Sequence, residues 1–129
     1  MSPITRATAI AAGGALLATP AVLFAAPAHA DVERHGNCGG GTYEFSVDRE
    51  DSGRYEVSLD LDRVKPGSTW KVVLKQNGNR FFSGKLTTDH EGDLDVERHR
   101  ANTTGKDTFK FKAKRVGHSS SCSRTITVA

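Results

Sequence analysis

The chain has little cysteine, little proline and few aromatic residues: two Cys, four Pro and 7% Phe, Trp and Tyr in 129 residues. The two cysteines form no C-x-x-C motif, the usual spacing of structural zinc sites and thiol oxidoreductases. No two of the five histidines stand two or four residues apart, as metal ligands on one element usually do. A G-x-S-x-G nucleophile motif is also missing. We therefore predict no catalytic, cofactor-binding or metal-ligating residues and expect the protein not to be an enzyme.

A long apolar run is confined to the first thirty residues. Residues 1–30 hold one charge, Arg6, followed by an Ala- and Leu-rich run over Ala7–Phe24 and a closing Ala-x-Ala at Ala30. This pattern predicts a cleaved secretory signal peptide at 1–30 and a protein that is extracellular or associated with the cell wall. Pro20 interrupts the run, and it is shorter than the ~20 residues of a spanning helix, so we expect no transmembrane segment after cleavage.

Residues 31–129 are short enough for a single domain. Without Arg6 they hold 17 basic and 15 acidic side chains, a balance that gives no reason to expect specific nucleic acid binding. Both cysteines, Cys38 and Cys122, fall in this part, and two cysteines in an oxidising compartment predict one disulfide. Closing so long a loop would stabilise the fold by about 4.5 kcal/mol in the chain-entropy description. A free pair acting as nucleophile or metal ligands is the less favoured alternative.

Alternation of apolar and polar residues dominates the sequence after residue 40 and predicts strands. In the segment 42–48, Tyr43, Phe45 and Val47 alternate with polar residues. Turn residues such as Asn77-Gly78 separate the alternating segments. We expect seven strands, near 42–48, 54–62, 69–75, 80–88, 92–99, 107–115 and 122–128. Their number and spacing predict an all-β fold, an immunoglobulin-like antiparallel β-sandwich of about seven strands over 31–129.

Three positions stand apart from the alternation. Arg124 shares the inward parity of the last strand, which indicates a bulge or an edge position. Phe81 is left on the outward side of the fourth strand. Cys38 precedes the first expected strand, and we expect its disulfide to tie that strand to the last one.

The sign of the charge alternates along the chain. Segment 41–62 holds seven acidic and two basic side chains, and segment 63–85 holds six basic and no acidic ones. Segment 86–105 is acidic again, and 106–129 is basic. An immunoglobulin-type connection places strands one, two and five in one sheet and strands three, six and seven in the other. We expect strand four to join the sheet of the basic strands. With this connection, one outer face of the sandwich is acidic and the other is basic.

The basic face is the best candidate for function. Its five lysines are expected to contact polyanions such as teichoic acids, phospholipid headgroups or extracellular nucleic acid: Lys71, Lys75, Lys110, Lys112 and Lys114. Lysines also improve solubility and protect sheets from edge pairing, which is the simpler explanation of the stripe. We thus expect a non-enzymatic secreted or envelope-associated binding domain whose partner is an anionic cell-wall polymer or a protein. The alternative is a secreted inhibitor or effector that presents a loop such as His99–Lys106 to a protein partner.

A run of acidic residues gives a weaker indication. Asp89, Glu91, Asp93 and Asp95 alternate with other residues, but their order differs from that of an EF-hand loop. A solvated strand face explains them more simply than a calcium site.

The blocks TWKVVLKQNGN, TTDHEGDLDV and ANTTGKDTFKFKAKRVGHSSSC resemble a family of small secreted actinomycete proteins. The marks are Trp70, Asn77-Gly78, Cys122 and the step Gly105-x-Asp107-x-Phe109. That step also resembles the corner before strand F of immunoglobulin-type domains, where an Asp ties the loop and an aromatic residue anchors the core. The resemblance implies secretion and a sandwich fold and supplies no catalytic residues.

Overall fold

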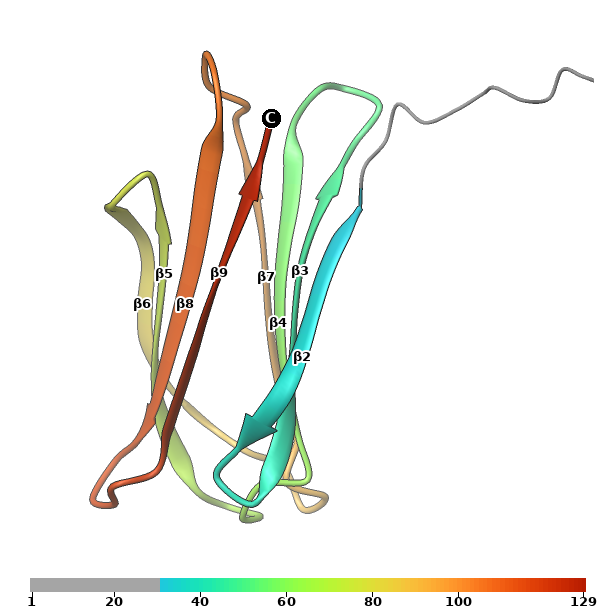
Figure 1. The fold of residues 1–129 in the computed structure, drawn as a ribbon. Helices are drawn as coiled ribbons and strands as arrows, with labels where there is room; N and C mark the ends of the chain where they lie inside the picture. The colour runs from blue at the N-terminus through green and yellow to red at the C-terminus, as the bar shows by residue number, and fades with distance from the viewer. Residues whose placement is uncertain (1–30) are drawn as a thin grey trace, which may run out of the picture.

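The computed structural model describes residues 31–129, which fold into two packed antiparallel sheets (Figure 1). The signal peptide expected at 1–30 lies outside these residues. One sheet has the order β2-β3-β4-β7 and the other the order β6-β5-β8-β9. The strands are β2 (Val32–Cys38), β3 (Gly41–Arg49), β4 (Tyr55–Asp62), β5 (Thr69–Gln76), β6 (Asn79–Thr87), β7 (Leu94–Arg100), β8 (Asp107–Arg115) and β9 (Ser121–Val128). The predicted all-β sandwich is confirmed.

The sheet membership expected from charge is also found. The acidic strands β3, β4 and β7 share one sheet, and the basic strands β5, β6 and β8 share the other with β9. The polar side chains that alternate along each strand therefore give the two outer surfaces opposite charge.

Strand β2 was not expected, and it makes the strand count eight. It pairs with β3 through the two-residue turn Gly39-Gly40, both residues having positive φ. Such turns favour glycine because side chains disfavour this conformation. Cys38 is the one fully buried residue of β2, so this edge strand has little apolar alternation to reveal it. The disulfide thus starts from β2, one strand earlier than predicted.

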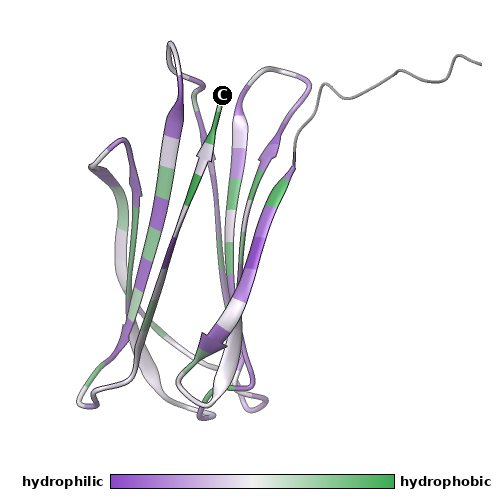
Figure 2. Cartoon of the chain, in the orientation of Figure 1, coloured by the Kyte–Doolittle hydropathy of each residue, from purple (hydrophilic) through white to green (hydrophobic). Residues whose placement is uncertain are grey.

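The core consists of the inward residues of both sheets, and Figure 2 shows the resulting alternation of hydrophobic and hydrophilic residues along the strands. Phe111 lies at its centre, with its ring centroid 5.0 Å from those of Tyr43 and Phe45. Phe109 packs edge-on against Tyr55 at 5.4 Å. Aromatic pairs in such tilted geometry stabilise a core beyond their buried area. The aromatic residues assigned inward from the sequence thus hold the two sheets together.

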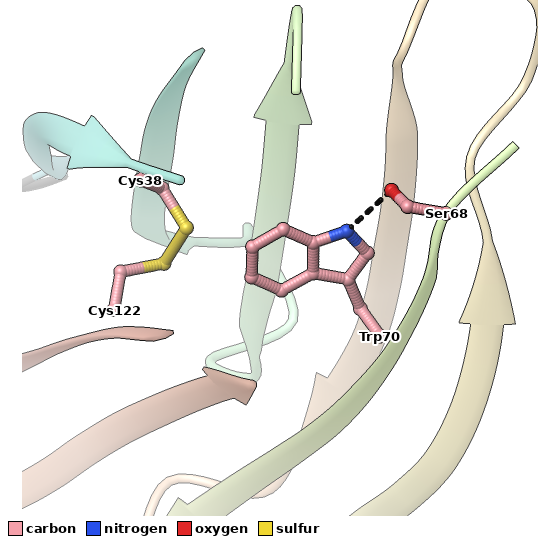
Figure 3. Close-up of a disulfide and its surroundings, with 4 residues drawn as sticks. All are labelled: Cys38, Ser68, Trp70 and Cys122. Carbon is pink, nitrogen blue, oxygen red and sulfur yellow. Dashed lines mark hydrogen bonds between the residues drawn. A yellow bond between two sulfur atoms is a disulfide. The ribbon is translucent and has the colours of Figure 1, made fainter. Parts of the chain in front are cut away.

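The seam between β2 and β9 is closed covalently at one end. Cys38 and Cys122 form the predicted disulfide, and Figure 3 shows the buried indole of Trp70 pointing toward it. The Trp70 Nε1–H donates to Ser68 Oγ at 2.9 Å, which satisfies its polar atom inside the core. Farther along, Arg124 donates to the hydroxyl of Tyr43 on β3. The sequence predicts either a bulge or an edge position at Arg124. The edge position is found, since β9 is the last strand of its sheet and leaves room for an inward arginine.

The opposite seam, between β6 and β7, is closed by stacked side chains. The guanidinium groups of Arg98 and Arg100 lie 4.5 Å above the ring centroids of Phe82 and Phe81, respectively. The pairing of β5 with β6 shifts register after Leu74, which leaves Phe81 as the additional residue. Such a bulge redirects side chains. The outward position predicted for Phe81 is therefore wrong, since the bulge lets it pack against the core with Phe82.

Candidate functional site

The outer surface of the β6-β5-β8-β9 sheet gathers the predicted lysines. All five lie on it, and Arg80 and Lys85 of β6 lie beside them opposite Lys75 and Lys71. We call this surface the basic face: Lys71, Lys75, Arg80, Lys85, Lys110, Lys112 and Lys114. The sequence predicts that the fourth strand, with Arg80 and Lys85, joins this sheet, but neither residue is in the predicted site. The bulge reverses the predicted parity of Arg80 and leaves that of Lys85 unchanged.

The cations of the basic face stand directly opposite one another. Lys71 pairs with Lys114, and Lys75 pairs with Lys110. Like charges in direct cross-strand pairs destabilise a sheet. Among residues 31–129, no carboxylate forms a salt bridge with any of the seven side chains. The face therefore concentrates positive charge that the described part of the chain leaves without a partner.

The position of these strands excludes one simple explanation of the lysines. Edge strands often bear lysine because it discourages pairing with other sheets. The five predicted lysines, however, lie on β5 and β8, the two central strands, whereas β6 and β9 form the edges. Protection of an edge therefore does not account for them.

A hollow of about 540 Å³ opens on the basic face. Val73, between two lysines of β5, lies in it, and the β5–β6 turn at Gly78 borders it. The cationic residues along its lining are Lys75, Arg80, Lys110 and Lys112. A concave surface lined by one sign of charge focuses the field and raises the local concentration of counter-ions.

Hydroxyl groups continue the basic face onto β9. Ser121, Ser123 and Thr125 stand opposite Lys114, Lys112 and Lys110, respectively. Each lysine of β8 thus has a hydroxyl-bearing neighbour on one side and a residue of β5 on the other. Ammonium and hydroxyl groups together can donate several hydrogen bonds to phosphate, sulfate or sugar oxygens.

The other outer surface gathers carboxylates. We call it the acidic face: Glu33, Glu44, Asp48, Glu56, Asp60, Asp62, Asp95 and Glu97. Partial burial, followed by the neighbouring carboxylates of Asp62, Asp95 and Glu44, raises the pKa of Asp60 to about 6. Burial and nearby carboxylates also raise the pKa of Asp48. Asp48 and Asp60 thus release their protons at higher pH than an isolated Asp, because they are partly buried and other acids lie near them.

Two histidines of this sheet lie among carboxylates that the sequence did not bring together. His35 Nε2 is 3.1 Å from Glu33 Oε1, and its Nδ1 is 3.6 Å from Glu44 Oε2 across the strand pair. His99 Nδ1 is 3.1 Å from Glu50 Oε1, with Glu56 in the same group. Glu33 and His35 are two residues apart on β2, and cross-strand pairing adds Glu44 to them and places Glu56 opposite His99. Spacing along one element could therefore reveal only the Glu33–His35 pair. In both sets a ring nitrogen already pairs with a carboxylate, which makes them ion pairs when the imidazole is protonated.

The acidic run before β7 forms a turn. Asp89 Oδ1 accepts hydrogen bonds from the backbone N–H groups of Glu91 and Asp93, at 2.9 Å each. These two hydrogen bonds lower the pKa of Asp89. Asp93 Oδ1 accepts from the backbone N–H of Arg63 at 3.0 Å. Asp89 and Asp93, two of the acids considered as calcium ligands, thus already accept backbone hydrogen bonds.

The loop after β7, the alternative binding element, is anchored at its base. The buried carboxylate of Asp107 accepts hydrogen bonds from the backbone N–H and hydroxyl of Thr103. Gln76 and Asn77 also donate to it, at 3.0 Å each. Burial alone would raise the pKa of Asp107, but these hydrogen bonds outweigh it and lower the pKa. His99 and Arg100, predicted as the start of this loop, belong to β7, so the loop is shorter than predicted. Residues 101–106 are exposed above the anchor.

Within residues 31–129 the structure has no helix that is long and apolar enough to cross a membrane. Comparisons of the chain with models of protein families, with curated proteins and with solved structures find no match.

Proposed function

We propose that this protein is a non-enzymatic secreted or envelope-associated domain that binds polyanions through its basic face. The observation that supports it best is the set of cross-strand cation pairs around the hollow, which have no carboxylate partner within the described residues. A phosphate-bearing cell-wall polymer fits this surface because lysines would pair with its charges and the β9 hydroxyls with its oxygens. The Cys38–Cys122 disulfide is compatible with an oxidising compartment outside the cytoplasm.

We further propose kinship with the small secreted actinomycete proteins that the sequence resembles, and an immunoglobulin-like connection of the strands in the sandwich. The position of Trp70 on β5 supports this proposal, because its buried indole points toward a disulfide, as the Trp of strand C does in immunoglobulin domains. The disulfide itself differs, since it joins the edge strands β2 and β9 and immunoglobulin domains bridge strands B and F. Asp107, which anchors the loop before β8, corresponds to the expected corner.

The experiment that tests polyanion binding measures how the protein distributes between culture medium and cell wall at rising salt. Wild type is compared with Lys71→Gln/Lys110→Gln/Lys112→Gln. We expect salt to release the wild type, since exposed ionic contacts are screened, and we expect little retention of the triple variant at any salt. The matched control is Lys65→Gln/Arg63→Gln/Arg34→Gln, which loses the same charge at exposed positions outside the basic face and outside the loop after β7. Equal release of all three proteins would contradict the proposal.

A second candidate function is inhibition of a protein partner through loop 101–106. The anchoring of its base by Asp107 favours this reading, because a preorganised loop loses less entropy on binding. Retention that resists salt, persists in the lysine variant and disappears in Thr104→Ala/Lys106→Ala would support the loop instead of the basic face.

A further inference from the structure

The charges on the two outer faces form rows that run across the strands. On the acidic face, Glu44, Asp60 and Asp95 stand directly opposite one another on β3, β4 and β7. A second acidic row contains Asp48 and Glu56. On the basic face, one row is Lys85, Lys71 and Lys114, and the other is Arg80, Lys75 and Lys110.

The spacing of the rows is the same on both faces. The acidic rows are four residues apart, from Glu44 to Asp48, and the basic rows are four residues apart, from Lys71 to Lys75. Four residues of a strand span about 13 Å, and neighbouring charges within a row are about 4.8 Å apart. Two rows of carboxylates on one copy therefore match two rows of cations on another in both directions.

Each face on its own is unfavourable. Cross-strand neighbours of like charge repel on both faces, and none of the cations has a carboxylate partner within the described residues. Placing one face on the other would add attractions that offset the repulsion within both faces. The complementary surface lies on the same chain, so every copy supplies a partner for the next.

We propose that copies of this protein stack, with the acidic face of one copy on the basic face of the next. The contact joins two different surfaces, which makes it heterologous. Because the surfaces lie on opposite sides of the sandwich, each added copy leaves one acidic and one basic face free, and the stack stays open. The inference does not depend on polyanion binding, although a polyanion would compete for the basic face.

The test is sedimentation velocity on the protein in the form that the cell accumulates, with its disulfide intact. We expect sedimentation coefficients that rise with protein concentration at about 10 mM salt and monomers at about 1 M salt, where screening acts within ~3 Å. Two variants each remove three charges from the rows of one face: Glu44→Gln/Glu56→Gln/Asp60→Asn and Lys71→Gln/Lys75→Gln/Lys110→Gln. Each should be monomeric alone, and thermal unfolding should show that both are folded.

The decisive sample is an equimolar mixture of the two variants. The intact basic face of the first variant can bind the intact acidic face of the second. The mixture should therefore form dimers of the two variants and no larger species. Lys65→Gln/Lys106→Gln, changed outside both faces, should stack like wild type. A wild type that is monomeric at low salt, stacking that survives in either variant, or a mixture that stays monomeric would each overturn the proposal. The acidic-face variant should still bind the cell wall, which separates this result from the outcome for polyanion binding.

Discussion

Gly39 lies against the indole of Trp70: a Cβ at this position would be 2.7 Å from the ring atom Cη2. Gly39 also has a φ of +51°, which disfavours any side chain by about 1–2 kcal/mol. Gly40 beside it has positive φ too, but a Cβ there would meet nothing within 4 Å. We therefore expect Gly39→Ala to reduce the free energy of unfolding clearly more than Gly40→Ala does. Denaturant unfolding of both variants measures the difference, and equal losses would contradict a close contact with Trp70.

Asp107 should be worth more to stability than its exposed acidic neighbours. Asp107→Ala leaves the donors of Thr103, Gln76 and Asn77 without their shared acceptor, and we expect a loss of about 3 kcal/mol. The pKa of this carboxyl is lowered in the folded protein, so its contribution is present at neutral pH and is lost as pH falls below the ordinary Asp value.

Chemical denaturation of wild type and Asp107→Ala between about pH 2 and 7 tests this expectation. The difference between the two proteins should shrink toward the acid end. Asp107→Asn, which keeps one acceptor oxygen, should lose less than the alanine variant. A difference that stays constant with pH would show that the charge of Asp107 contributes nothing.

Asp60 should have the opposite pH dependence. Its pKa is about 6 when folded, so between about pH 4 and 6 the folded protein holds a proton that the unfolded chain has released. Stability therefore falls as pH rises through this window. We expect Asp60→Asn to raise the melting temperature at about pH 7 and to leave it nearly unchanged near pH 4. Glu91→Gln, in the exposed turn before β7, is the control, and an equal gain from it would contradict a specific role of Asp60.

The buried hydroxyl of Tyr55 makes no hydrogen bond with the described residues. The side chain of Tyr55 is 2% exposed. Removing an unsatisfied buried hydroxyl while keeping the ring costs little or stabilises. We expect Tyr55→Phe to match or exceed wild-type stability, whereas Tyr43→Phe, which loses the hydrogen bond from Arg124, should be about 1 kcal/mol less stable. The reverse order in thermal melts would mean that Tyr55 has a partner.

The sequence predicts the sandwich well because buried strands leave a strong pattern. Phe45, Leu59 and Phe111 are inward on strands with alternating burial, and the predicted parity is correct for each. The alternating sign of charge then places strands in sheets, since a central lysine such as Lys112 must face outward. The five lysines of the candidate site follow directly from this parity.

The features missed depend on contacts between strands. β2 is held by pairing with β3 and by one buried cysteine, so the segment around His35 has little apolar alternation. The bulge at Phe81 changes parity by one residue, and it hid Arg80 as a neighbour of Lys75. The dipeptide Gly39-Gly40 was the available indication of a hairpin, because both residues adopt positive φ.

The disulfide also decides how this sandwich would respond to mechanical force. Tension applied across residues 31 and 129 reaches Cys38 and Cys122 and passes through the bond between them. Only the eight residues Asp31–Cys38 and the eight residues Cys122–Ala129 can then be pulled away from the sheets, and their combined contour length is roughly 55 Å. Strands β3 to β8 lie inside the closed loop and bear no load while the bond is intact. The basic and acidic faces of these strands would therefore keep their shape on a stretched chain, and reduction of the bond would expose them to the full pull.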